Sequence, residues 1–461
     1  MNIPVGSRMY RDFERLELKG LIPSSMLSTK PFTRLEGLRL LGEAEERLDS
    51  LSGDTQARSI LERLKKELGD ERNKTERVII KPVESIHTGI LYSARTPDYP
   101  NINNNGDAFR EGFNLRAGVG VKVELFDTVS LYANPEYRFD DTDPRMEFLR
   151  GYALANLIGV ELLAGRDSMW WGAGYHGNLL VTNNAKPFDM IKVTSGHPFL
   201  LPWVFSYIGL LKPTLFLTRL EGDRDFANPY LAGLRLDVKP FPYFQIGFSR
   251  VAMFGGGNRT VDAGTVLDVL TAGTENTLEE PGNQIASVDA KIIVPWGPLP
   301  FTLYGEIGGE DEAGSLPSQI GYVVGVFLSH SFGTGDIDLR LEYADDYVDG
   351  HPGVWYTHHL YTTGYTYNGR VIGHHMGSDA RDLFVRLQYH ADPNATIGIE
   401  ADLERHGADA GEKKNWFGID ADYRLTEYFS LSGGVGMERD YSAADDEDSN
   451  TVFWLNTDFA F

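Results

Sequence analysis

Apolar and polar side chains alternate along most of this chain with a period of two residues. The last eleven residues show the pattern most clearly. Because successive side chains of a β-strand point to opposite faces of a sheet, such a segment is predicted to be a strand with one apolar and one polar face. The apolar face carries Phe453, Leu455, Thr457, Phe459 and Phe461, and the other face carries Trp454, Asn456, Asp458 and Ala460.

Similar segments follow one another from about Glu76 onward, and their second face is mostly charged. They run for ~10 residues, which suits a tilted crossing of a lipid bilayer, whereas strands of soluble proteins average ~5–6 residues. The clearest apolar faces are Ile337, Leu339, Leu341 and Tyr343, then Leu383, Val385, Leu387 and Tyr389, then Ile397, Ile399, Ala401 and Leu403, and then Phe417, Ile419, Ala421 and Tyr423.

The connections between these segments alternate between short turns and long polar loops, as in outer-membrane β-barrels. The first segment leads into a long loop and the last one follows a long loop. Both ends of the predicted sheet therefore lie on the short-turn side, and the number of strands is even. We predict an all-β transmembrane β-barrel of about 18 antiparallel strands, with its apolar faces toward lipid. The long loops are 93–111, 140–145, 254–284, 308–318, 345–379, 405–413 and 439–450.

The first ~70 residues have the three- and four-residue apolar spacing of helices instead. Three short amphipathic helices would bury their apolar stripes against one another. We therefore predict two domains, a periplasmic helical bundle over residues 1–72 and an outer-membrane barrel over residues 73–461. An outer-membrane location requires an export signal. Residues 1–5 lack the basic start and apolar core of one, so we expect the numbering to begin at a mature or expressed form.

The composition narrows the range of functions. A formal net charge of −23 over 461 residues argues against a nucleic-acid partner. The chain has no cysteine, which excludes a disulfide scaffold. No run approaches the ~18 consecutive apolar residues of a transmembrane helix.

Two segments combine aromatic, histidine and asparagine side chains in a way that suits contact with a glycan. Aromatic faces stack on the C–H faces of sugars, and polar side chains hydrogen-bond to hydroxyls. The first segment, residues 170–184, could equally be an aromatic girdle at the membrane interface followed by a packed turn. The second, 354–379, could be a loop that only closes the barrel. The candidate polysaccharide-binding residues are Trp170, Trp171, Tyr175, His176, Asn178, Asn183, Trp355, Tyr356, His358, Tyr361, Tyr365, Arg370, His374 and Asp379.

Metal binding and catalysis are not predicted. Adjacent histidines, such as those in the second segment, do not define a ligand geometry, so we expect no metal and no cofactor. Carboxylates on the predicted inner faces could include a catalytic pair. Inner faces of such barrels are commonly acidic and hydrated, however, so the protein is predicted not to be an enzyme. These carboxylates are Glu400, Asp402, Glu404, Asp420 and Asp422.

A series of different short motifs is spread along almost the whole chain. They include Lys30-Pro31-Phe32-Thr33-Arg34, Trp171-Gly172, Asn183-Asn184-Ala185, Gly247-Phe248-Ser249-Arg250, Gly373-His374 and Gly377-Ser378-Asp379. In this order they resemble the capsule assembly protein Wzi family. The resemblance implies an 18-stranded outer-membrane barrel with a periplasmic helical bundle, closed by its own loops. It also implies a lectin-like role in attaching exported capsular polysaccharide to the cell surface.

We therefore expect a non-catalytic protein of a Gram-negative outer membrane that binds or anchors capsular or extracellular polysaccharide. Its expected surroundings are membrane lipid and lipopolysaccharide, and a polysaccharide export complex is a further candidate partner. The alternative is a porin-like diffusion channel whose acidic lumen favours cations.

Overall fold

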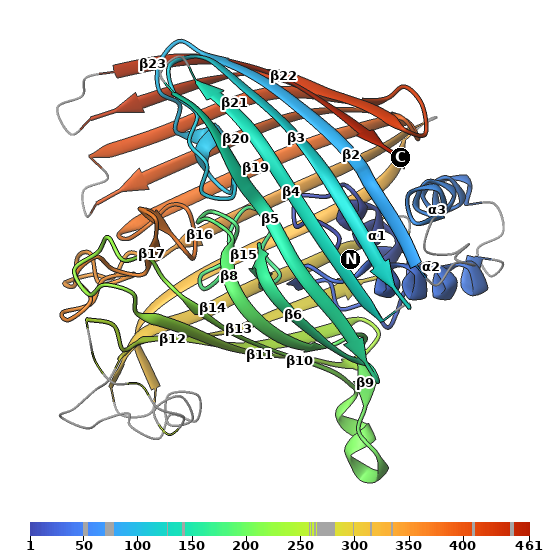
Figure 1. The fold of residues 1–461 in the computed structure, drawn as a ribbon, viewed down its shortest axis with the longest axis horizontal. Coiled ribbons are helices and arrows are strands. Elements are labelled where there is room, and N and C mark those ends of the chain that lie inside the picture. Colours follow the sequence, from blue (N-terminus) through green and yellow to red (C-terminus); the bar gives the residue numbers. More distant parts are fainter. Residues whose placement is uncertain are drawn as a thin grey trace.

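In the computed structural model, eighteen strands close into a barrel within the part of the chain that the structure describes (Figure 1). Each strand is antiparallel to the next one along the chain, and the last, β23 (Glu447–Ala460), pairs with the first, β2 (Val78–Ser93). Thr88 lies opposite Thr457 at this closing seam. The prediction of an antiparallel transmembrane barrel of about 18 strands is confirmed.

The described residues are 1–48, 54–69, 78–126, 128–140, 143–257, 259, 261, 264, 282–297, 299–313, 316–332, 335–407, 411–442 and 447–461. The predicted domain boundary between residues 72 and 73 lies outside them. The other barrel strands are β3 (Gly112–Leu125), β4 (Val129–Asp140), β5 (Asp143–Leu157), β6 (Val160–Asp167), β8 (Phe188–Ser195), β10 (Leu210–Arg219), β11 (Tyr230–Phe241), β12 (Phe244–Phe254), β13 (Gly282–Val294), β14 (Phe301–Ala313), β15 (Leu316–Phe332), β16 (Gly335–Asp345), β19 (Ala380–Asp392), β20 (Ala395–His406), β21 (Glu412–Arg424) and β22 (Phe429–Tyr441).

Short pairings complete the sheet structure. β9 (Phe199–Leu200) pairs with one end of β10. Two further pairs lie apart from the barrel sheet, β1 (Thr29–Lys30) with β7 (Trp170–Trp171), and β17 (Thr366–Tyr367) with β18 (Arg370–Val371). Between β9 and β10 the short helix η2 (Trp203–Ile208) projects outward from the wall (Figure 1).

The period-two pattern of the sequence becomes the two faces of the barrel wall. Leu341, Ile397 and Phe417 point outward and are 37%, 52% and 47% exposed. Arg340 and Asp402, one position before Leu341 and one after Ala401, point inward and are buried. A wall with apolar side chains outside and charged side chains inside is what a barrel surrounded by lipid requires.

Three helices precede the barrel strands, α1 (Met9–Leu18), α2 (Arg34–Leu48) and α3 (Thr55–Glu67). Asp54 caps α3, because its side chain accepts a hydrogen bond of 2.9 Å from the backbone N–H of Ala57. Their apolar stripes share one core, which includes Phe13, Leu16, Leu40, Ile60 and Leu64. Among the described residues, none of the helices has both the length and the apolar character needed to cross a membrane.

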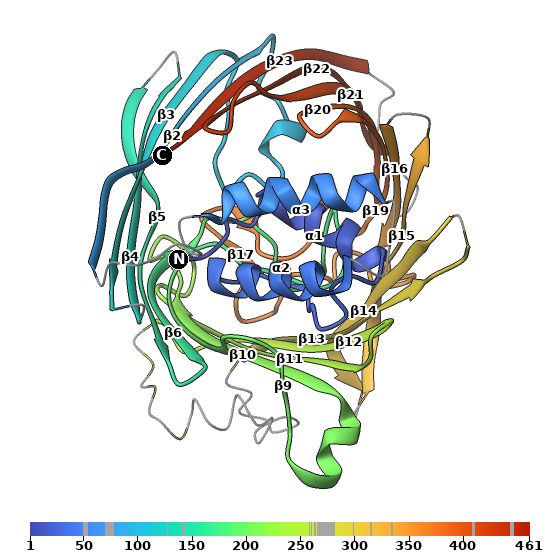
Figure 2. The same ribbon diagram turned by 90° about the vertical axis from the view of Figure 1, so that its right-hand side faces the viewer.

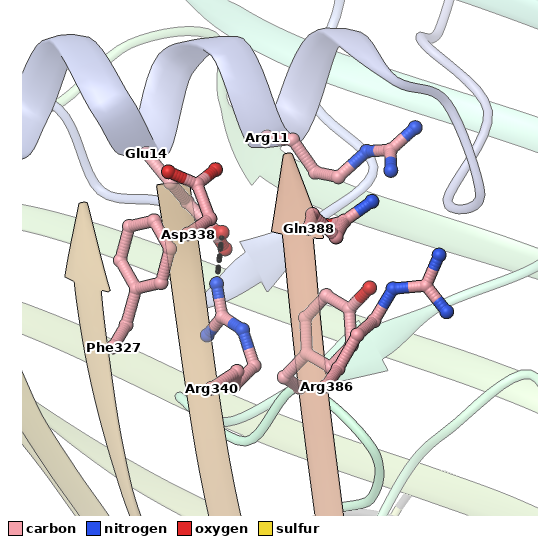
Figure 3. A pocket seen from close by; sticks show the side chains of 8 residues that line it. Arg11, Glu14, Phe327, Asp338, Arg340, Arg386 and Gln388 are labelled. Carbon is pink, nitrogen blue, oxygen red and sulfur yellow. Dashed lines mark hydrogen bonds and ion pairs between the residues drawn. The ribbon is translucent and has the colours of Figure 1, made fainter. Parts of the chain in front are cut away.

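The helices lie across one end of the barrel, inside the ring of strands (Figure 2). Ion pairs fix α1 to the inner wall. Glu14 pairs with Arg340 of β16 at 2.8 Å (Figure 3). Arg8 pairs with Asp422 of β21 at 2.7 Å, and Arg15 pairs with Asp336 of β16. The charged inner face of the barrel therefore serves as the docking surface for the helices.

Candidate functional site

Two long connections fold into the interior of the barrel and bind each other there. The first, residues 168–187, joins β6 to β8, and the second, residues 346–379, joins β16 to β19. The hydroxyl of Tyr356 donates a hydrogen bond of 2.8 Å to the carbonyl of Leu179. The hydroxyl of Tyr365 donates one of 3.0 Å to the carbonyl of Leu180. We call these two connections the inner segments.

Carboxylates of the barrel wall hold the inner segments in place. Glu342 of β16 accepts hydrogen bonds from the backbone N–H groups of Tyr175, His176 and Gly177, at 2.7, 2.9 and 2.9 Å. Glu306 of β14 accepts one of 2.8 Å from the N–H of Leu179, and its neighbour on the same strand, Glu310, accepts one from Tyr356. The wall carboxylates thereby provide hydrogen-bond acceptors for backbone N–H groups of the inner segments, which have no regular secondary structure at these positions.

Most candidate residues chosen from the sequence are buried within these inner segments. Their aromatic faces are covered by protein, and their polar atoms mainly bond to the segments themselves. For example, Asn178 accepts a hydrogen bond of 2.9 Å from the N–H of Gly174, and the indole N–H of Trp170 donates one of 3.0 Å to the carbonyl of Gly174. The buried candidates are Trp170, Trp171, His176, Asn178, Asn183, Trp355, Tyr356, Tyr361, Tyr365 and His374, and the half-buried ones are Tyr175, His358, Arg370 and Asp379.

An open pocket lies instead against strands β2, β3, β20, β21 and β23. Its volume is about 260 Å³. Tyr99, from the short helix η1 (Tyr99–Asn101), stacks on Trp416 with ring centroids 4.5 Å apart. The indole N–H of Trp416 donates a hydrogen bond of 3.1 Å to Glu400. We call this the aromatic pocket, and its lining includes Tyr99, Phe109, Arg116, Glu400, Trp416, Trp454 and Asn456.

Glycines of β22 make room for the two tryptophans. A Cβ added at Gly436 would lie 1.9 Å from the ring of Trp416, and one at Gly434 would lie 2.3 Å from the ring of Trp454. Trp454 is also the cross-strand partner of Gly434. The indole rings therefore lie flat over glycine backbone, which fixes them against the wall.

A second pocket, of about 110 Å³, shares Tyr99 and Trp416 with the first. Its other walls are charged, and Lys414 there pairs with Asp98 at 3.4 Å. Arg370, a candidate from the sequence, is part of this lining. We call it the polar pocket, and it is lined by Asp98, Arg370, His375, Asp402, Glu404, His406, Lys414, Glu438 and Asp440 among others.

Three histidines of the inner segments meet strand carboxylates beside the polar pocket. Burial, and then the nearby ring of His375, lower the pKa of His176 to about 4, so its imidazole is neutral at pH 7. Burial opposes a charge on His375 too, but the carboxylates of Asp382 and Glu404 outweigh it and raise its pKa to about 10. Burial also lowers the pKa of His374 well below its usual value.

Comparison with known proteins identifies the family. The family model described as capsule assembly protein Wzi matches residues 82–451. The chain belongs to the Wzi family. A relative from Klebsiella pneumoniae, described as an uncharacterized 55.8 kDa protein in the cps region, is 29% identical over 189 residues, which is 39% of this chain. The match spans 36% of that relative's length.

A solved structure shares the fold of this Wzi-family chain. Wzi from Escherichia coli is described as an outer membrane protein involved in group 1 capsule assembly and as a carbohydrate-binding β-barrel. It aligns with a TM-score of 0.81 and 18% identity, over 100% of this chain and 99% of that one. OccD3 (OpdP) of Pseudomonas aeruginosa aligns over 84% of this chain and 92% of its own, with 12% identity and a TM-score of 0.47.

Proposed function

We propose that this Wzi-family chain is a non-catalytic outer-membrane protein that binds capsular or extracellular polysaccharide and anchors it at the cell surface. The aromatic pocket is the observation that carries the proposal. Tyr99, Trp416 and Trp454 offer flat apolar faces, while Arg116 and Asn456 offer hydrogen-bonding groups beside them. A concave, mostly apolar site with a few polar groups is the usual form of a ligand pocket, and this combination suits a sugar ring.

Glu400, the carboxylate in the wall of the aromatic pocket, makes contacts that favour binding over catalysis. Glu400 accepts a hydrogen bond from Trp416 and pairs with the guanidinium of Arg386, which also pairs with Asp420 at 2.8 Å. A general acid in glycoside hydrolysis needs a carboxyl group that keeps its proton. Both carboxylate oxygens of Glu400 instead accept hydrogen bonds, one from Trp416 and one from Arg386.

The different ends of the barrel support one orientation in the membrane. We place the three helices and the short turns in the periplasm and the long connections outside the cell. The helical end is then the side on which a polysaccharide export complex would dock. The outward apolar side chains would contact membrane lipid and, at the outer end of the wall, lipopolysaccharide. The aromatic residues of η2, Trp203, Phe205 and Tyr207, lie toward the helical end and would contact membrane lipid there.

We also propose that the barrel does not conduct. The helices cross one end of the lumen, and the inner segments are bonded to the wall on several sides. A porin-like channel is the competing function. Planar-bilayer recording of the purified protein separates the two, because a closed barrel gives no steady conductance, whereas stable open steps would favour transport.

Surface retention tests the anchoring role directly. A strain that lacks the protein should release its surface polysaccharide into the medium while producing the same total amount, and the wild-type chain should restore retention. Cell-associated and free polysaccharide are measured side by side. Unchanged retention in the deletion strain would refute the anchoring role.

A further inference from the structure

Four side chains from separate parts of the chain meet at one point inside the barrel. His176 comes from the first inner segment and His375 from the second, while Asp382 belongs to β19 and Asp402 to β20. One nitrogen or oxygen atom from each lies within 4.8 Å of the corresponding atoms of the other three. All four side chains are more than nine-tenths buried.

Three of the separations between these atoms are close to those around a tetrahedral metal ion. Nε2 of His176 lies 3.3 Å from Oδ2 of Asp402 and 3.7 Å from Oδ2 of Asp382. Nε2 of His375 lies 3.4 Å from the same oxygen of Asp382. Donors held about 2.0–2.2 Å from Zn²⁺ in a tetrahedron stand about 3.3–3.6 Å from one another.

Several polar atoms of these four side chains lack good hydrogen-bond partners. Nε2 of His176, both ring nitrogens of His375 and one oxygen each of Asp382 and Asp402 are buried and form no hydrogen bond of acceptable geometry. Buried polar atoms are normally paired, because leaving one unpaired costs about 1–3 kcal/mol. Two buried carboxylates that face each other also repel unless a cation or a proton lies between them.

From this arrangement we propose that His176, His375, Asp382 and Asp402 form a binding site for a divalent transition-metal ion, with Zn²⁺ as the first candidate. Two imidazoles and two carboxylates suit Zn²⁺ and its first-row neighbours. Ca²⁺ prefers six to eight oxygen ligands, so this donor set does not suit it. The site is independent of the proposed glycan binding, and either can fail without the other.

Neighbouring groups orient the ligands. The ring of His176 stacks on Phe384 with centroids 4.0 Å apart and an interplanar angle of 10°, and its backbone N–H is held by Glu342. Glu404 lies 3.1 Å from Nε2 of His375, the nitrogen that would bind the metal, and pairs with His406 at 2.9 Å. The ring stacking and the backbone hydrogen bond fix the orientation of His176, as outer contacts do for metal-binding histidines.

The position of the site indicates what the metal would do. It would join both inner segments to two neighbouring strands of the wall, at the edge of the polar pocket that His375 and Asp402 help to line. The metal would therefore clamp the inner segments, and with them the side chains of Arg370 and His375 that line the polar pocket.

Metal analysis of the purified, detergent-solubilised protein tests the site. The full chain is prepared without a polyhistidine tag, stripped with a chelator, reloaded with ZnCl₂ and desalted. We expect about one Zn²⁺ per chain, and we expect Co²⁺ loading to give the visible absorption of a tetrahedral site. The double variant His176→Gln/His375→Gln should bind Zn²⁺ at least about a hundredfold more weakly, since loss of one outer partner already costs about 10–100-fold.

A matched control separates this site from histidines in general. His390 lies on β19 and pairs with Asp338 at 2.9 Å, away from the cluster, so His390→Gln should bind Zn²⁺ like the wild type. Circular dichroism and heat-modifiable gel migration confirm that each variant has folded. Equal Zn²⁺ binding by wild type and the double variant, or none by folded wild type, would overturn the proposal. In that case a shared proton or a charged His375 balances the carboxylates.

Discussion

At the scale of single residues, Glu17 shows how charge fixes the helices inside the barrel. Its carboxylate, in the last turn of α1, accepts hydrogen bonds from Lys239 of β11 at 3.0 Å, Lys291 of β13 at 2.7 Å and Ser25 at 2.7 Å. Burial alone would raise the pKa of this carboxyl, but the two ammonium groups outweigh it and lower the pKa to about 2. Glu17 is therefore ionised at pH 7 and links the first helix to two strands.

Removing this charge should destabilise the protein strongly. Glu17→Gln leaves Lys239 and Lys291 buried without their shared counter-charge, and breaking a buried pair in this way typically costs about 3–5 kcal/mol. Thermal unfolding in detergent, followed by circular dichroism, measures the loss. Glu62→Gln is the matched control, because that side chain is 64% exposed and its replacement should change the stability by less than about 0.5 kcal/mol. Equal unfolding of both variants would contradict this role of Glu17.

The same residue predicts a dependence on pH. The folded-state pKa of Glu17, about 2, lies below its ordinary value of 4.5. Its contribution to stability is therefore complete above about pH 4.5 and is lost as the pH falls toward 2. The difference in stability between wild type and Glu17→Gln should shrink over this interval. Because the other carboxylates titrate in both proteins, their contributions cancel in this difference. A stability difference that stays constant with pH would show that the contacts with Lys239 and Lys291 do not lower the pKa of Glu17.

At the scale of elements, the sequence predicts the wall well and the interior poorly. A strand that faces lipid shows its period in its own residues, and the three helices show their apolar stripes in the same way. The course of the first inner segment depends instead on Glu342, 167 positions after Tyr175. Local patterns carry no information on a contact of that kind.

The aromatic pocket did leave a signal in the sequence. Trp416 and Trp454 occupy inward positions of β21 and β23, where most neighbours are polar or glycine. A large aromatic ring on the polar, inward face of a strand indicates that another group packs on it. The alternation places Trp454 on the polar face of the last strand, but only the fold brings it near Trp416 and Tyr99. The proposed metal site likewise could not be seen in the sequence, because its four residues come together only through the pairing of β19 with β20 and the folding of both inner segments.

Removal of the second inner segment should open the barrel. Residues 350–378 are replaced by a short Gly/Ser turn, which removes the tyrosines bonded to Leu179 and Leu180. We expect steady conductance steps in planar bilayers that the wild type does not show. The control variant replaces η2 outside the wall with Gly/Ser of equal length and should remain silent. A silent deletion variant that is folded would show that the helices alone close the lumen.

At the scale of the whole molecule, the outer face of the barrel wall has one role and the inner face has two. Its outer face is apolar and suits lipid, as the exposed side chains of Ile397 and Phe417 illustrate. Its inner face carries charges that bind the helices at one end and the inner segments in the middle. The same inner face supplies the tryptophans of the aromatic pocket. The fold therefore places the aromatic pocket on the same inner face that holds the helices and the inner segments.

Glycan binding by the aromatic pocket is the claim on which this account depends most directly. Oligosaccharides from the host's own surface polysaccharide are titrated into purified wild type, Trp416→Ala and Phe417→Ala, and affinity is measured by calorimetry. Trp416→Ala should weaken binding about thirtyfold, equivalent to about 2 kcal/mol for a stacking anchor. Phe417→Ala, on the outer face of the same strand, should bind like the wild type. Equal affinity of Trp416→Ala and wild type, or no binding by wild type, would contradict the account.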